Sequence, residues 1–210
     1  MKRTHEVLWG ALFFLSFYLS IPCLLRAGTS TEQLRSTVDR VLAIVNDPSL
    51  KSEARREERR AQLRQVIYPR FDFAEMAKRS LGPHWQRRTP EEQREFVKIF
   101  TGLLEQSYVD TIESYNGEKI VYTNEILEKS SAEVATKIVT KKEEFSLNYK
   151  LHLVSGEWKV YDVVVENISL VNNYRSQFNR TITTASYADL IRRMKEKQIE
   201  SPAKKKSKVG

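Results

Sequence analysis

The sequence contains few of the residues that metal and nucleophile chemistry require. Its 210 residues include one cysteine, Cys23, and three histidines. A structural zinc site needs about four ligands from Cys, His and acidic side chains, and neither an HExxH pattern nor a helical pair of histidines occurs. The seven glycines are scattered and build no phosphate-binding loop. We therefore expect no metal site, no disulfide and no nucleotide cofactor.

Basic charge is also scarce where a nucleic-acid-binding protein would need it. The formal net charge is +8. Most of it comes from the two ends, namely Lys2, Arg3 and Arg26 near the N-terminus and the lysines of residues 204–208. The part between them is close to neutral, and its run "EARREERR" alternates in sign, which is typical of a solvated helix face. These features argue against nucleic acid as a partner.

The N-terminus has the pattern of a secretory signal. Lys2 and Arg3 precede the uncharged run "VLWGALFFLSFYLSIPCLL", and "RAGTS" follows it. We predict a signal peptide over residues 1–27, a folded domain over 28–200 and a disordered Lys-rich tail over 201–210. The alternative is an uncleaved membrane anchor, because about 20 apolar residues can span a bilayer.

The periodicity of apolar residues predicts helices, then antiparallel strands, then helices. Spacings of three and four predict helices at 30–46, 52–67, 73–81, 90–115, 169–183 and 187–197, the first with a capping box of Ser30 and Gln33. Alternation predicts strands at 119–127, 132–140, 145–153 and 158–165. The last strand is apolar on both sides, which is typical of a strand at the centre of a sheet.

One acidic residue in this strand is a candidate catalytic group. Asp162 is followed by Val163, Val164 and Val165, and apolar surroundings can raise the pKa of a carboxyl group into the range of a general base. The alternative is a structural carboxylate that meets solvent or a basic neighbour at the strand edge. His84 and His152 have no partners in the sequence that would indicate a catalytic set.

Four segments, in this order, resemble the MlaC family of periplasmic phospholipid-binding proteins, also called toluene-tolerance proteins. They are "FDFAEMAKRSLGPHW", "TPEEQREFVKIFTGLLEQSY", "YKLHLVSGEWKVYDV" and "DVVVENISLVNNYRSQF". The resemblance covers about residues 31–194. Asn167 stands where the family pattern has Gly, and Asn tolerates the left-handed backbone that such a turn needs.

The resemblance implies an α+β fold and a carrier function. The fold would be cone-like (NTF2-like), with a curved antiparallel sheet of about four strands wrapped by helices, an N-terminal helical annex and an apolar cavity. The protein would be a monomeric periplasmic carrier that shuttles phospholipid between the outer and inner membranes. Its implied partners are an inner-membrane ABC transporter with MCE domains and an outer-membrane lipoprotein complex. No cofactor is implied, because phospholipid is the cargo. The alternative function is an enzyme on the same cone-like scaffold, with Asp162 as general base for a small apolar substrate.

Large apolar side chains on the long helix, the alternating strand and the helix after Asp162 are the candidates for the cavity wall. Arg175, on the last of these helices, is expected at the rim, where it could meet the lipid phosphate or a backbone carbonyl; the alternative is a structural ion pair. The predicted wall residues are Phe96, Phe100, Leu103, Tyr108, Phe145, Leu147, Tyr149, Leu151, Leu170, Tyr174 and Phe178.

Overall fold

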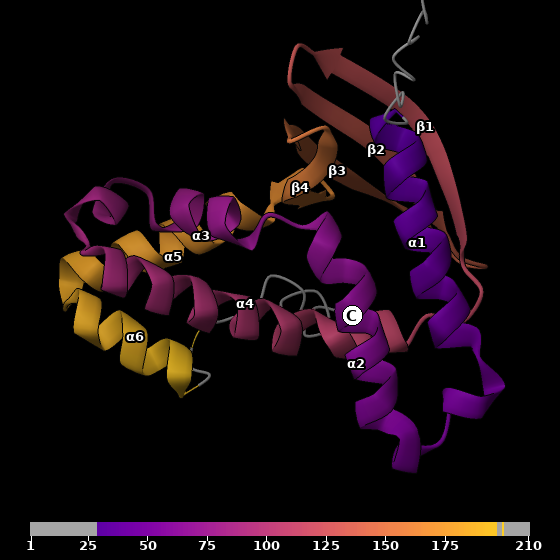
Figure 1. The fold of residues 1–210 in the computed structure, drawn as a ribbon, viewed down its shortest axis with the longest axis horizontal. Coiled ribbons are helices and arrows are strands. Elements are labelled where there is room, and N and C mark those ends of the chain that lie inside the picture. The colour runs from indigo at the N-terminus through magenta and orange to yellow at the C-terminus, as the bar shows by residue number, and fades with distance from the viewer. Residues whose placement is uncertain (1–28, 197–198, 200–210) are drawn as a thin grey trace, which may run out of the picture.

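The computed structural model describes residues 29–196 and residue 199, which form one sheet and six α-helices (Figure 1). The predicted signal peptide and Lys-rich tail lie outside these residues. Short 3₁₀ turns at Pro48–Leu50, Glu53–Arg55, Tyr68–Arg70 and Gly82–Arg87 connect the first four helices. The helices are α1 Ser30–Asn46, α2 Arg56–Ile67, α3 Phe73–Leu81, α4 Pro90–Glu113, α5 Leu170–Thr184 and α6 Tyr187–Lys195.

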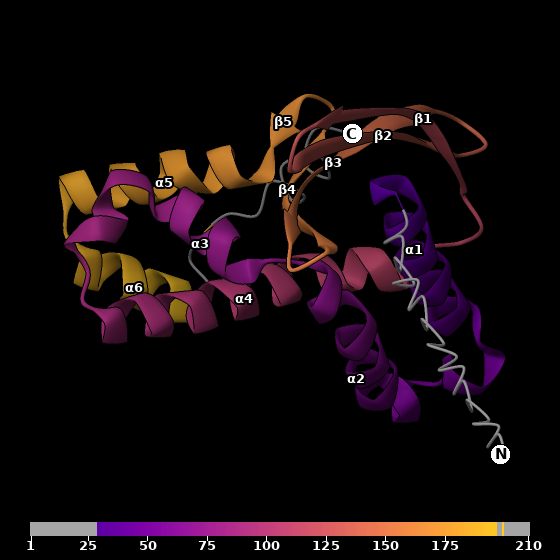
Figure 2. The ribbon, with the colours of Figure 1, turned by 45° about the horizontal axis from the view of Figure 1, so that its top comes forward.

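The sheet is an antiparallel meander in which each strand pairs with the next along the chain. Its strands are β1 Lys119–Glu128, β2 Ser131–Val139, β3 Glu144–Val154, β4 Glu157–Val165 and β5 Ile168–Ser169. The predicted α+β class and curved antiparallel sheet are confirmed (Figure 2). The fifth strand was not predicted, because two residues are too few to show a period.

The prediction that the last long strand lies at the sheet centre is wrong. β4 pairs with β3 along one side, but its other side meets only β5 and a single bridge from Val160 to Phe71. The strand is apolar on both sides because α3 and α5 also pack against it. Helix packing at a sheet edge can thus produce the same pattern as burial in the sheet centre.

Two separate groups of buried residues stabilise the fold. The sheet core joins α1 to one side of the sheet (Figure 2) and consists of Leu34, Ala132, Val134, Leu151, Trp158 and Val160. The helix core joins α3, α4, α5 and α6 and consists of Met76, Ala77, Leu81, Phe96, Phe100, Leu103, Leu104, Leu170, Val171, Tyr174, Phe178, Leu190 and Met194.

Aromatic rings at the centre of the helix core pack edge to face. Phe100 on α4 meets Tyr174 and Phe178 on α5 with ring centroids 5.5 and 5.9 Å apart. All three are fully buried, and their T-shaped geometry is the favoured one for aromatic pairs. This contact fixes α4 against α5.

Side-chain caps set where several helices begin. At α1 the capping box consists of Thr29 and Glu32 rather than the predicted Ser30 and Gln33. Ser30 is the first residue of the helix. Its hydroxyl donates a hydrogen bond to Glu125 on β1, so it forms a tertiary contact and does not cap the helix. At α4 the predicted start is confirmed, with Thr89 and Glu92 forming the box.

A half-buried ion-pair network holds α2 against α4. Arg59 Nε donates to Glu113 Oε1 at 2.7 Å, and an Arg60 nitrogen donates to Glu113 Oε2 at 2.8 Å. Burial raises the pKa of Glu113, but the hydrogen bonds and charges of Arg60 and Arg59 outweigh burial and hold the pKa below its usual value. The basic run on α2 is therefore partly a docking surface for α4.

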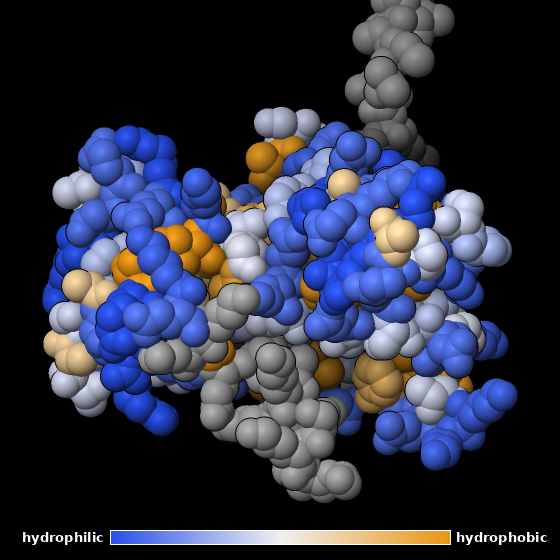
Figure 3. Space-filling view, turned by 90° about the horizontal axis from the view of Figure 1, so that it is seen from below, coloured by the Kyte–Doolittle hydropathy of each residue, from blue (hydrophilic) through white to orange (hydrophobic). Residues whose placement is uncertain are grey.

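One face of the molecule is mostly hydrophilic. The face shown in Figure 3 is dominated by hydrophilic side chains, with hydrophobic residues visible only as separate patches. Across residues 29–196, every helix is too short or too polar to span a bilayer.

Removing one ring of the aromatic contact tests how much the helix core contributes to stability. We expect Phe100→Ala to lower the free energy of unfolding by about 3–5 kcal/mol, because it opens a cavity in a packed core. The control Ile126→Ala removes an exposed side chain and should change it by about 0.5 kcal/mol or less. Urea unfolding measures both. Equal effects of the two substitutions would contradict the assignment of the core.

The Glu113 network predicts a specific pH dependence. A carboxyl group whose pKa is lowered by folding stabilises the fold above its unfolded pKa of about 4.3, and that contribution is lost as the pH falls through the folded pKa. We expect Glu113→Gln to cost about 3 kcal/mol at neutral pH, because it leaves Arg59 without a carboxylate partner and Arg60 with only the exposed Asp110.

The same substitution should cost little once Glu113 is protonated in the wild type. Urea unfolding at a series of pH values down to the acid range measures the difference. The control Glu95→Gln breaks an exposed pair with Lys195 and should have almost no effect at any pH. A Glu113→Gln effect that does not diminish in acid would show that the network is not electrostatic.

Candidate functional site

The sheet presents a continuous, largely apolar surface on the side that faces α1, which we call the concave face (Figure 2). Residues directly opposite one another in an antiparallel pair point to the same side. On β2 and β3 the register pairs Ala132 with Leu151, Val134 with Tyr149, Thr136 with Leu147, and Ile138 with Phe145. On the outer strands Ile120, Tyr122, Val163 and Val165 continue these rows.

Helix α1 covers only part of the concave face. Leu34 packs where Val134 and Leu151 are fully buried. At the other end the apolar side chains remain half-buried. Within the described residues, neither core includes Ile120, Ile138, Phe145, Leu147 or Val165. A row of apolar side chains on the concave face is thus incompletely covered by protein.

Two tyrosines on the concave face have phenol groups that are shielded from water. Burial raises the pKa of both Tyr122 and Tyr149, that of Tyr122 to about 12. The Tyr122 hydroxyl is buried and has no hydrogen-bond partner among the described residues, while the Arg35 guanidinium lies 4.3 Å from the centre of its ring. Both phenol groups therefore lie where burial disfavours a charged form.

The structure divides the predicted wall residues between two places. Phe145, Leu147, Tyr149 and Leu151 lie together on the concave face. The other predicted residues belong to the helix core or pack against it, where they contact one another: Phe96, Phe100, Leu103, Tyr108, Leu170, Tyr174 and Phe178. Whether either group touches a ligand stays a prediction. The period of the apolar residues shows which face of each helix or strand is buried. It does not show which of these buried faces pack against one another.

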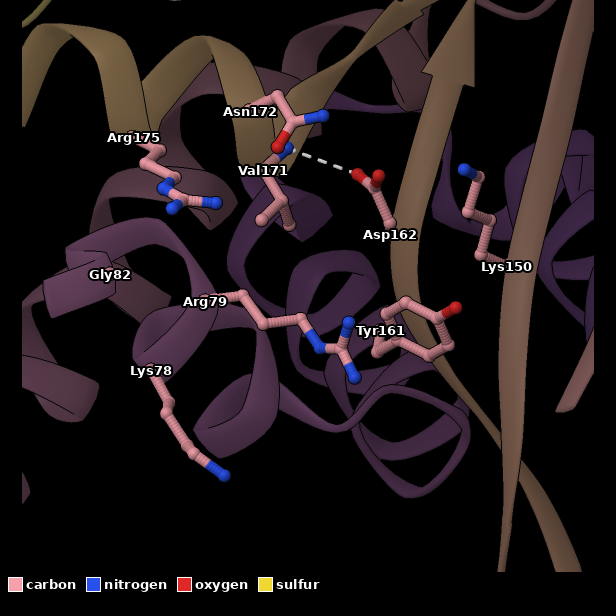
Figure 4. Close-up of a pocket in the computed structure, with 9 residues that line it drawn as sticks. All are labelled: Lys78, Arg79, Gly82, Lys150, Tyr161, Asp162, Val171, Asn172 and Arg175. Carbon is pink, nitrogen blue, oxygen red and sulfur yellow. Dashed lines mark hydrogen bonds between the residues drawn. The ribbon is translucent and has the colours of Figure 1, made fainter. Parts of the chain in front are cut away.

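A second feature is a pocket of about 300 Å³ between α3, α5 and the strands β3 and β4 (Figure 4). Its lining is mainly polar and charged, unlike that of the concave face. It consists of Lys78, Arg79, Gly82, Lys150, Tyr161, Asp162, Val171, Asn172 and Arg175. Of these, sequence reasoning singled out Asp162 and Arg175 as candidate functional residues and missed the lysines.

A β-bulge directs Asp162 into this pocket. The register shifts by one residue on β4, so that Leu151 pairs with Val160 but Lys150 pairs with Asp162. Asp162 consequently shares the outer side of the sheet with Lys150, and Val163 returns to the concave face opposite Tyr149. Bulges commonly re-aim a side chain in this way.

Asp162 joins β4 to the start of α5. Its Oδ2 accepts a hydrogen bond from the Ser169 hydroxyl at 2.6 Å, and its Oδ1 accepts one from the Val171 N–H at 3.0 Å (Figure 4). The side chain is 5% exposed. A carboxylate at a helix N-terminus is favoured by the helix dipole. The structural interpretation of Asp162 thus fits the geometry better than the catalytic one.

Arg175 packs against a tight turn rather than in an ion pair. Gly82 has φ +58°, and a Cβ built there would lie 3.0 Å from Arg175 Nε. In the described part of the chain no hydrogen bond or ion pair engages the Arg175 guanidinium. The structure places Arg175 at the outer pocket, with Asp162 and Lys150, and away from the concave face.

Comparison with known proteins decides the family. Residues 35–196 match the family model described as MlaC protein. The chain belongs to the MlaC family. Its resemblance on the four sequence segments is thereby confirmed over most of the described residues.

Within these residues no group of three or more His, Cys, Asp and Glu side chains could hold a metal ion.

Curated relatives and a solved structure agree with this assignment. The chain is 25% identical to the toluene tolerance protein ttg2D of Pseudomonas putida over 85% of this chain and 80% of that protein. It is 22% identical to the intermembrane phospholipid transport system binding protein MlaC of Haemophilus influenzae, over 65% and 67% of the two chains. A phospholipid-binding protein from Ralstonia solanacearum, solved in complex with a phospholipid, is similar with a TM-score of 0.73 and 25% identity, over 80% of this chain and 96% of that one.

Replacing Asp162 tests its structural role. We expect Asp162→Ala to lower the free energy of unfolding by about 2 kcal/mol and to speed hydrogen exchange in the first turn of α5, because the Val171 N–H loses its acceptor. Asp162→Asn keeps one acceptor oxygen and should cost less. The control Asp110→Ala removes an exposed carboxylate. Unchanged exchange at Val171 in Asp162→Ala would contradict this role.

Proposed function

We propose that this chain carries a phospholipid with its acyl chains against the uncovered part of the concave face. The observation that carries the proposal is the row of half-buried apolar side chains there, which includes Ile138, Phe145 and Leu147. Incompletely buried apolar rows of this kind mark binding sites for apolar ligands or partners. The related protein from Ralstonia solanacearum, which is bound to a phospholipid, supports the choice of ligand.

The energetics of transfer explain why such a carrier needs an apolar face. Each buried CH₂ group is worth about 0.8 kcal/mol, so two acyl chains of about fourteen methylenes represent roughly 22 kcal/mol relative to water. A carrier must come close to matching that value, or the lipid stays in its membrane. The residues of the concave face are able to supply this environment because they are apolar and have few polar neighbours.

The remaining parts of the proposal follow from family membership and from the N-terminal pattern. The protein would act in the periplasm as a monomer after removal of residues 1–27. It would exchange lipid with an inner-membrane ABC transporter carrying MCE domains and with an outer-membrane lipoprotein complex. Transfer of an intact lipid breaks no covalent bond, so the function requires neither a catalytic group nor a cofactor. The enzymatic alternative is not favoured, because both Asp162 oxygens already accept hydrogen bonds.

Native mass spectrometry of the isolated protein tests the proposal. We expect roughly one phospholipid per chain, because a bound lipid gains the full transfer energy of its acyl chains. Leu147→Glu should reduce the occupancy about tenfold or more, because it buries a carboxylate beside those chains.

The control Ile126→Glu places the same charge on the outer side of β1, where Ile126 lies opposite Glu133 and is exposed. Its lipid occupancy should equal that of the wild type. A wild-type protein isolated without lipid would overturn the proposed function. Equal lipid occupancy in Leu147→Glu and Ile126→Glu would instead show that the acyl chains do not lie on the concave face.

A further inference from the structure

The outer pocket is separate from the surface proposed for the acyl chains. Lys150 and Asp162 point to the side of the sheet opposite Tyr149 and Leu151, because successive residues of a strand alternate between its two faces. The proposed function leaves this pocket without a role. Its chemistry also differs, since five of its nine lining residues are charged.

Cationic groups outnumber acidic ones in the pocket. Lys78, Arg79, Lys150 and Arg175 line it together with one carboxylate, Asp162 (Figure 4). Two of the four cations have an acidic partner nearby, since Glu75 pairs with Lys78 at 3.3 Å and with Arg79 at 2.8 Å.

The other two cations, Lys150 and Arg175, have no hydrogen bond or ion pair from their charged groups within the described residues. They come from different elements, β3 and α5. Asp162 does not neutralise them in a salt bridge, because its two oxygens accept from Ser169 and Val171. The pocket therefore has positive charge available for a ligand.

Packing restricts where the Arg175 guanidinium can go. Its Nε and neighbouring carbons lie against Gly82, so the turn after α3 supports the side chain. Arg79 is held in a similar way, with its guanidinium 4.2 Å from the centre of the Tyr161 ring. Supported guanidinium groups lose less entropy on binding an anion, and their planar fork matches the oxygens of a phosphate.

We propose that this pocket binds the phosphate group of a phosphate ester, with Arg175 and Lys150 as its principal contacts. Its volume of about 300 Å³ suits a head-group-sized ligand rather than a whole lipid. The ester is a free small phosphate ester, because the pocket lies on the side of the sheet opposite the surface proposed for the acyl chains. The proposal therefore does not rest on the proposed function.

The test uses the full chain as isolated, with its lipid load measured by native mass spectrometry. Glycerol 3-phosphate is titrated while the amide resonances of Gly82, Lys150 and Val171 are followed by NMR, and glycerol serves as the uncharged comparison. The variants are Arg175→Gln and Lys150→Gln, with Arg180→Gln as the matched control, an exposed arginine on the same helix outside the pocket.

One result would support the proposal. We expect saturable shifts with glycerol 3-phosphate but not with glycerol, weakened about tenfold by Arg175→Gln or Lys150→Gln and unaffected by Arg180→Gln. No saturable shift with glycerol 3-phosphate would overturn it.

The proposal is also overturned if the titration does not distinguish Arg175→Gln and Lys150→Gln from Arg180→Gln. Isolation without lipid would contradict the proposed function alone, because glycerol 3-phosphate can still be titrated into the empty protein. Thermal unfolding of each variant separates loss of binding from loss of fold, and the Lys150 variant does not disturb the contact with Gly82.

Discussion

The packing of α4 against α5 is the interaction on which the rest of the structure depends. A protein that leaves apolar side chains half-covered gives up part of the burial that would otherwise stabilise it. Here the aromatic contact of Phe100 with Tyr174 and Phe178 supplies burial at a site away from the sheet. The sheet can then leave Phe145 and Leu147 incompletely covered without loss of the fold. Two cores therefore allow one part of the molecule to be stable and another to remain open to a ligand.

Polar contacts join the two cores and explain how the sheet is held beside the helices. Asp162 connects β4 to the first turn of α5. Arg70, between α2 and α3, donates to Gln33 and Thr37 on α1 and to the carbonyl of Trp158 on β4. Such contacts are directional, unlike apolar packing, so they fix the orientation of the elements at modest energetic gain. The orientation of the concave face relative to the helix core is thus determined by a small number of polar side chains.

The order of helices and strands could be predicted from the sequence because each long element has its own period. The alternation from Phe145 to Leu153 predicted β3 correctly, and apolar spacings of three and four predicted α4 from its first residue, Pro90. What could not be predicted was which buried faces meet. Tyr174 and Phe145 were both predicted to line the cavity, yet one fills the helix core and the other lies on the concave face. That difference depends on tertiary packing, which no local period records. The β4 bulge could not be predicted either, because the extra residue, Tyr161, is itself largely apolar and leaves the apolar pattern of the strand unchanged.

The bulge allows β4 to contribute to two surfaces of different chemistry, the apolar concave face and the charged outer pocket. Trp158 and Val160 face the sheet core, so strict alternation would bring residue 162 to the same side, and its carboxylate would enter the apolar face. The extra residue at the bulge instead turns Asp162 outward, opposite Lys150, and places Val163 opposite Tyr149. A buried carboxylate among apolar groups would carry a large desolvation cost, whereas on the outer side it caps α5. One local irregularity therefore keeps the concave face apolar and at the same time concentrates the charged groups in the outer pocket.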